Sequence, residues 1–179
     1  MKKLVAVILG CLTLTSCGKP IYTEMDGITG ISHDGHGNIT VHVVVCENTV
    51  SKIKLIGGFY DGPNGTNNPP LGTLESPTPQ TDYFTVNLSN PAPWFYSEPP
   101  RIPTDPEKLL MPSPVVDDHG NRWIFGAAKI VDYTGLKMEE IYAAPPNMVV
   151  ESRFESTPLV STPEQFAAKQ PHYCGENKI

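Results

Sequence analysis

Three histidines and an aspartate fall close together near the start of this 179-residue chain. His33, Asp34 and His36 lie in a glycine-rich stretch, and His42 follows six residues later. Imidazole and carboxylate groups are zinc ligands and general bases, but a zinc site needs three or four ligands in a fixed geometry. The glycine-rich stretch has the composition of a turn, so its histidines could reach His42 only by folding back. We therefore expect solvent-facing turn residues here, and no metal.

A second group of acidic residues with a histidine occurs at Asp117, Asp118 and His119. Adjacent residues on a tight turn rarely converge on one substrate atom, and aspartates before Gly-Asn suit the tip of a hairpin. The chain lacks the Gly-x-Ser-x-Gly elbow of a hydrolase, and the Gly-Gly pair at 57–58 lacks the following helix of a phosphate-binding loop. The sequence thus predicts no catalytic and no cofactor-binding residues, and we expect the protein not to be an enzyme.

An aromatic triplet, Trp94-Phe95-Tyr96, stands between Pro93 and Pro99 in a proline-rich segment. Exposed aromatic rings on a stiff loop bind partners well, because they lose little conformational entropy. Aromatic rings can equally close the open end of a β-sandwich core. Trp94, Phe95 and Tyr96 are therefore a candidate partner surface, and core packing is the alternative that the sequence favours.

The N-terminus has the pattern of an export signal. Two lysines precede an apolar run of eleven residues, which is too short for a membrane span of about 20 residues. The run leads into Leu-Thr-Ser-Cys17, which looks like the bacterial lipobox. This motif implies cleavage before Cys17, a diacylglycerol on its sulfur, and attachment to the extracytoplasmic face of the cell membrane, where two long chains hold far better than one. An ordinary signal peptide with a free Cys17, or a poor membrane span, is the alternative.

These features divide the chain into a lipoprotein signal peptide at 1–16, a lipidated tether at 17–25 and a single domain at 26–179. The signal takes two lysines from the 13 basic residues, which leaves 11 against 19 acidic residues and a net charge of −8. Nucleic acids need a basic surface, so we expect no nucleic-acid partner. The tether is short, so the lipid on Cys17 keeps the domain close to the membrane.

The remaining cysteines point to one disulfide. Cys11 belongs to the signal and Cys17 takes the lipid, which leaves Cys46 and Cys174 in an oxidising compartment. One disulfide between these two is the expected outcome. Two buried thiols, or a metal-binding or reactive pair, are the alternatives.

The hydrophobic pattern predicts a mainly β domain. A hairpin is indicated where Asp-Gly and Gly-Asn pairs precede the β-branched run at 39–46. Further strands are predicted at 50–60, 83–88, 115–131 and 148–154, short helices at 136–142 and 162–170, and long loops at 61–80 and 89–114. A single β-sandwich-like domain or a curved antiparallel sheet, with two short helices and one disulfide, fits this order.

Three features together resemble small lipoproteins of actinobacteria and their phages. They are the lipobox, a Gly-Ile-Ser-x-Asp-x-x-Gly turn before a valine-rich strand that ends at Cys46, and a C-terminal segment that runs from Ser-Thr-Pro-Glu-Gln-Phe to Tyr-Cys174. The resemblance covers both ends of the mature chain. It implies a single β-rich domain and reinforces the pairing of Cys46 with Cys174, and it implies no activity or substrate.

Three classes of function fit these observations. The first is a binding module at the cell envelope, which engages an envelope protein, a glycan or a phage component, with phage exclusion as one variant. The second is a carrier of a small apolar ligand held between the sheet and the helices. The third is a hydrolase or metal-binding enzyme that uses His33, His36, Asp117 or His119. The short tether and the aromatic loop favour the first class.

Overall fold

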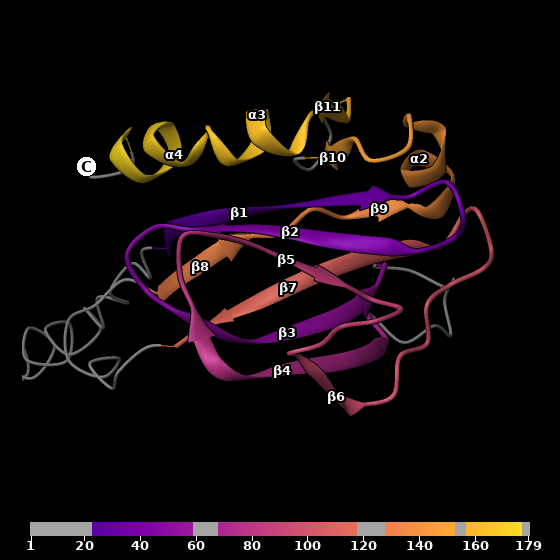
Figure 1. The fold of residues 1–179 in the computed structure, drawn as a ribbon, viewed down its shortest axis with the longest axis horizontal. Helices are drawn as coiled ribbons and strands as arrows, with labels where there is room; N and C mark the ends of the chain where they lie inside the picture. Colours follow the sequence, from indigo (N-terminus) through magenta and orange to yellow (C-terminus); the bar gives the residue numbers. More distant parts are fainter. Residues whose placement is uncertain (1–22, 59–67, 118–127, 153–156, 177–179) are drawn as a thin grey trace, which may run out of the picture.

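A computed structural model describes residues 23–58, 68–117, 128–152 and 157–176 of the chain. Two β-sheets face each other, and short helices lie against one side of the sandwich (Figure 1). The strands are β1 (Thr23–His33), β2 (Ile39–Val45), β3 (Val50–Gly57), β4 (Pro70–Gln80), β5 (Tyr83–Asn87), β6 (Phe95–Glu98), β7 (Leu109–Val116), β8 (Ala128–Asp132), β9 (Leu136–Lys137), β10 (Val149–Glu151) and β11 (Leu159–Ser161). The helices are α2 (Met138–Ala143), α3 (Pro163–Ala167) and α4 (Gln170–Glu176).

The first sheet has the strand order β11-β10-β1-β2-β5, and β8 pairs with β1 in parallel. Its centre is the predicted hairpin of β1 and β2, in register from Gly27 opposite Val45 to His33 opposite Ile39. The second sheet has the order β6-β4-β3-β7-β9, and each of these neighbouring pairs is antiparallel. The two sheets are joined by the β2–β3 turn, so the sandwich is one continuous unit.

The core lies between the sheets because successive residues of a strand point to opposite faces. On β2, Val41, Val43 and Val45 belong to this core, whereas His42 and Val44 face the helices on the other side. Burial of these aliphatic side chains on both faces explains why β2 reads as an almost unbroken apolar run. Opposite them, β3 supplies Val50, Ile53 and Leu55.

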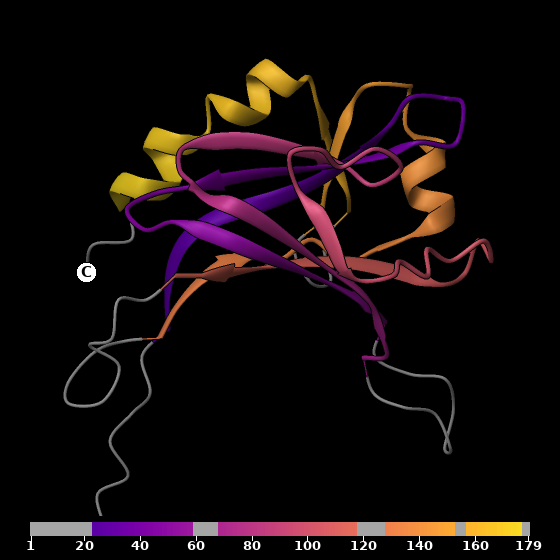
Figure 2. The ribbon, with the colours of Figure 1, turned by 60° about the horizontal axis from the view of Figure 1, so that its bottom comes forward.

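The C-terminal helices cover the outer face of the first sheet (Figure 2). Helix α3 begins where the sequence predicted, because the Thr162 hydroxyl accepts from the Gln165 N–H (3.2 Å) and the Gln165 side chain accepts from the Thr162 N–H (3.0 Å). The helix buries Phe166 in a small second cluster with Ile28, Val44 and Val149. The predicted second helix, 162–170, corresponds to α3, which ends at Ala167, and α4 is a further short helix that the sequence did not predict.

A disulfide between Cys46 and Cys174 fastens α4 to the end of β2, across 128 residues of sequence. Next to it, the buried Asp26 carboxylate accepts from the backbone N–H groups of Glu47 and Asn48 and so holds the β2–β3 turn. We call this region of the sandwich the disulfide end. The opposite end, formed by the β1–β2 turn, α2 and the segment 99–108, is called the turn end; it lies on the right in Figures 1 and 2.

The predicted fold class, a mainly β domain with short helices and one Cys46–Cys174 disulfide, is confirmed. The predicted long loops are not free of regular structure, because 61–80 contains β4 and 89–114 contains β6 and most of β7. These strands were not predicted because β4 and β7 contain prolines, and a proline within a segment argues against a strand. Within the described residues no helix is long and apolar enough to cross a membrane.

Candidate binding site at the turn end of the sandwich

The turn end begins with the tight turn that follows β1. The Asp34 carboxylate accepts from the backbone N–H groups of His36 (2.7 Å) and Asn38 (3.1 Å), which closes the turn that the sequence predicted. Hydrogen bonds from the Asn38 side chain and the His36 backbone hold the pKa of Asp34 below its usual value. His36 is exposed at the tip. Asp34 therefore acts on the backbone of its own turn.

His33 does not face solvent as the sequence predicted, because it is buried beside α2. The Gly35 N–H donates to its Nδ1 (3.0 Å), so Nε2 carries the proton and donates to the carbonyl oxygen of Ala144 (2.9 Å). The edge of the ring lies against Tyr142, with 5.1 Å between the centroids and 67° between the planes. His33 thus links the β1–β2 turn to α2 and packs against the Tyr142 ring.

A cleft of about 500 Å³ lies beside Tyr142, between α2 and the segment 102–106. We call it the Tyr142 cleft. Its apolar surface comes from Ile102, Pro103 and Met138, and its polar groups come from Thr104 and Glu139. Tyr142 is 43 % exposed, and no hydrogen-bond partner of its hydroxyl occurs among the described residues. An apolar surface with a few convergent polar groups is the usual make-up of a small-molecule site.

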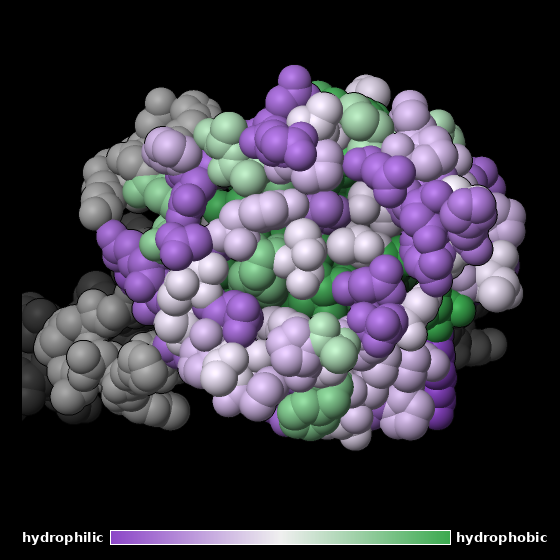
Figure 3. Space-filling model, in the orientation of Figure 1, coloured by the Kyte–Doolittle hydropathy of each residue, from purple (hydrophilic) through white to green (hydrophobic). Residues whose placement is uncertain are grey.

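A second cleft of about 500 Å³ lies on the other side of Pro103, which lines both. We call it the Leu109 cleft. Leu71 and Leu109 supply apolar surface, and the charged groups Arg101, Asp105, Glu107 and Lys108 stand around it. Hydrophilic residues gather over this end of the molecule in Figure 3, on the right-hand side. The two clefts are both lined by residues of the segment 101–109 and share Pro103.

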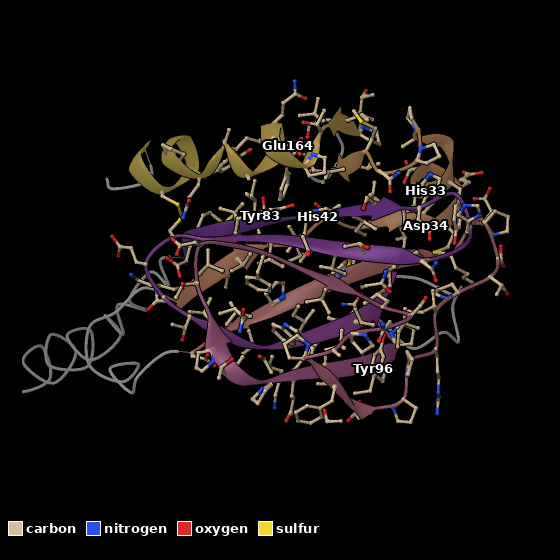
Figure 4. All side chains as sticks on the ribbon, in the orientation of Figure 1. His33, Asp34, His42, Tyr83, Tyr96 and Glu164 are labelled. Atoms are coloured by element: carbon tan, nitrogen blue, oxygen red, sulfur yellow. A yellow bond between two sulfur atoms is a disulfide. The ribbon has the colours of Figure 1, made fainter. Side chains whose placement is uncertain are left out.

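A buried hydrogen-bonded array lies elsewhere, under α3 (Figure 4). The His42 Nε2 atom is 2.8 Å from the Ser32 hydroxyl, and its Nδ1 atom is 2.8 Å from the Tyr83 hydroxyl. Burial lowers the pKa of His42 to about 4, and burial together with the Glu164 charge raises the pKa of Tyr83. A serine beside a histidine is the start of a nucleophilic site, but Ser32 and His42 are 6 % and 4 % exposed, and the Phe166 ring covers the histidine. In this arrangement the hydrogen bonds link β1, β2 and β5, and the Phe166 ring of α3 packs against His42 and Tyr83.

The aromatic triplet is divided between core and surface. Trp94 is 4 % exposed and stacks on Phe84 with 5.6 Å between the ring centroids. The Tyr96 hydroxyl donates to the Leu88 carbonyl oxygen (2.7 Å), and burial raises the pKa of this tyrosine. Phe95, on the edge strand β6, is 50 % exposed. Of the three residues, Phe95 is the one whose ring stands free for a partner.

The other sequence candidates do not meet at the clefts. The Asp117 carboxylate accepts hydrogen bonds from the hydroxyls of Thr49 (3.0 Å) and Ser51 (2.6 Å). It therefore stabilises the start of β3. Asp118 and His119 lie outside the described residues, as does Cys17. Groups of three or more His, Cys, Asp or Glu side chains able to hold a metal do not occur in the described part of the chain.

The sequence did not predict the cleft beside Tyr142 or the array around His42. The signal for His42 was available, since a histidine in the middle of an apolar strand must find buried partners. Tyr142 gave no signal, because its cleft is made with residues nearly forty positions earlier in the chain. No protein-family model, no curated protein and no solved structure matches this chain.

Proposed function

We propose that this protein is a lipid-anchored binding module of the cell envelope, which presents its turn end to a partner or ligand away from the membrane. The lipobox supports the anchor, and the direction of β1 supports the orientation. β1 is 11 residues long, so at about 3.3 Å per residue it carries the chain about 35 Å from Thr23 to the turn end. An anchor on Cys17 is at most about 21 Å of chain from Thr23, so the disulfide end would lie next to the membrane.

The second sequence hypothesis, a carrier with its ligand between sheet and helices, receives no comparable support. The Phe166 ring fills the space between α3 and the first sheet, where it packs with Ile28, Val44 and Val149. The clefts at the turn end, by contrast, are open to solvent-borne molecules. Binding at the turn end is therefore the function that the geometry favours.

Lipidation is tested by metabolic labelling with an alkyne-tagged palmitate, followed by membrane fractionation. We expect the wild-type protein to carry the label and to sediment with membranes, and Cys17→Ser to lose both properties. Cys11→Ser is the matched control, because Cys11 lies in the signal; it should be labelled like the wild type. Label on Cys17→Ser would contradict the anchor.

Orientation is tested with the lipidated protein in vesicles that contain a headgroup-labelled acceptor dye. A donor dye is placed on a new cysteine, either Thr81→Cys near the disulfide end or Thr104→Cys at the turn end; both positions are exposed. We expect stronger energy transfer from position 81 than from position 104, because the two ends are separated by the length of β1. Equal or reversed transfer would contradict the proposed orientation.

A further inference from the structure

The Tyr142 ring is a fixed, exposed platform. It is 43 % exposed, yet it makes a T-shaped contact with the His33 ring at 5.1 Å between centroids, and the hydrogen bond from His33 to Ala144 holds that histidine in place. An aromatic ring that is held rigidly before binding loses little entropy when a ligand stacks on it. The ring therefore favours ligands with a flat apolar face.

The surroundings of the ring are amphipathic. Ile102, Pro103 and Met138 line the cleft with apolar surface, while the hydroxyls of Thr104 and Tyr142 have no hydrogen-bond partner among the described residues. A pyranose ring has the complementary character, with an apolar face of C–H groups and a rim of hydroxyls. Its face can lie on an aromatic ring while its rim hydrogen-bonds to polar side chains at the edge of the cleft.

The charges disfavour an ionic ligand. Glu139 at the Tyr142 cleft is paired with Lys137 (3.4 Å), which also binds Glu107 (2.6 Å). Around the Leu109 cleft, Arg101 and Lys108 are balanced by Asp105 and Glu107. With no excess of positive charge at the clefts and a mature net charge of −8, an anionic polymer would be repelled. A neutral ligand fits best.

We propose that the two clefts bind a neutral glycan chain, with one sugar stacked on Tyr142 and the next sugars passing over Pro103 into the Leu109 cleft. A chain rather than a single sugar is indicated because Pro103 lines both clefts, which makes them adjacent subsites. The exposed Arg101 side chain supplies donors for sugar oxygens at the second subsite. This inference rests on the proposed binding function and names its ligand class.

The test is a titration of the full-length protein, purified from membranes in a sugar-free detergent, with triacetylchitotriose, cellotriose and trigalacturonic acid. Saturation-transfer NMR identifies the bound sugar protons, and equilibrium dialysis gives Kd. We expect saturable binding of at least one neutral trisaccharide and none of the acidic one. Tyr142→Ala should weaken binding about tenfold or more, whereas Tyr142→Phe, which keeps the ring, should stay within about threefold of wild type.

Phe95→Ala is the matched control, because it removes an exposed aromatic ring outside the clefts; it should bind like the wild type. Thermal unfolding of each variant checks that the domain is folded. The proposal is overturned if neither neutral sugar binds, if Tyr142→Ala binds as tightly as wild type, or if a proline-rich or apolar peptide occupies the cleft instead. The failure of sugar binding in a protein that is lipidated and oriented as above would leave the proposed envelope role standing, so the two proposals fail separately.

Discussion

The Nε2 atom of His42 lies 2.8 Å from the Ser32 hydroxyl, across the β1–β2 pair and on the face that α3 covers. Both residues are buried, and the other ring nitrogen of His42 is occupied by the Tyr83 hydroxyl. Because each hydroxyl can donate or accept, the neutral imidazole is satisfied on both sides. The same burial penalises the charged imidazolium, so this array makes the fold sensitive to acid.

The stability of the domain should therefore fall between pH 6.5 and pH 4. Burial lowers the pKa of His42 from 6.5 in the unfolded chain to about 4 in the folded one, so the unfolded state takes up the proton first. The contribution of neutral His42 to the free energy of unfolding is fully present above pH 6.5. It is lost as the pH falls towards 4, by up to about 3 kcal/mol. Denaturant titrations at a series of pH values measure it.

Two variants isolate this effect from that of other groups. His42→Gln is expected to be less stable at pH 7 and to lose much of the dependence on pH between 6.5 and 4. His36→Gln, which removes an exposed histidine of the β1–β2 turn, should follow the wild-type profile. A wild-type profile for His42→Gln would show that the acid sensitivity arises elsewhere.

Loss of the disulfide should lower the free energy of unfolding by several kcal/mol. The bond closes a loop of 128 residues, for which the chain-entropy model gives about 4 to 5 kcal/mol, with smaller values common in practice. We expect Cys46→Ser/Cys174→Ser to unfold at lower denaturant concentration than the oxidised wild type. Dithiothreitol should bring the wild type close to the double variant and leave the double variant unchanged; a shift of the double variant would mean that the reductant acts on something else.

The neighbours Trp94 and Phe95 should respond oppositely to truncation. Trp94→Ala removes a buried ring that stacks on Phe84, so it should cost about 3 to 5 kcal/mol. Phe95→Ala removes a half-exposed ring from an edge strand and should change stability by less than about 0.5 kcal/mol. Chemical denaturation of the two variants decides this. Similar losses for both would place Phe95 in the core and would remove it as a surface for partners.

Local chemistry made much of the first sheet predictable. The Asp34 turn, the β-branched apolar run of β2 and the capping box at Thr162 each carry their structural signal within a few residues. The pairing of Cys46 with Cys174 followed from the cysteine count in an exported chain, because few thiols were left to choose from. These elements position α3 and the β1–β2 turn.

In the second sheet the sequence predicted β3, but it did not predict β4, β6, most of β7 or the clefts, which depend on long-range pairing. Pro112 and Pro114 lie within β7, where the sequence indicated a loop, and they are tolerated beside β3 because β9 reaches only Leu109 and Leu110 on the other side. The Tyr142 cleft depends in turn on how β7 and the segment before it approach α2. Such contacts between distant segments leave no periodic pattern in the sequence, so the cleft became visible only in the folded chain.

Gly30→Ala tests how tightly the helices are packed on the first sheet. An added Cβ would stand 2.4 Å from the Val149 Cγ1 atom and 3.0 Å from the Phe166 ring, so we expect a loss of about 1 to 3 kcal/mol. Adding Val149→Ala should relieve this overlap. The double variant should therefore lose less unfolding free energy than the two single variants lose together. Additive losses would mean that the alanine side chain is accommodated without Val149. A Gly30→Ala variant as stable as wild type would show free space under α3. It would then support the hypothesis that the protein carries a small apolar ligand between the sheet and the helices.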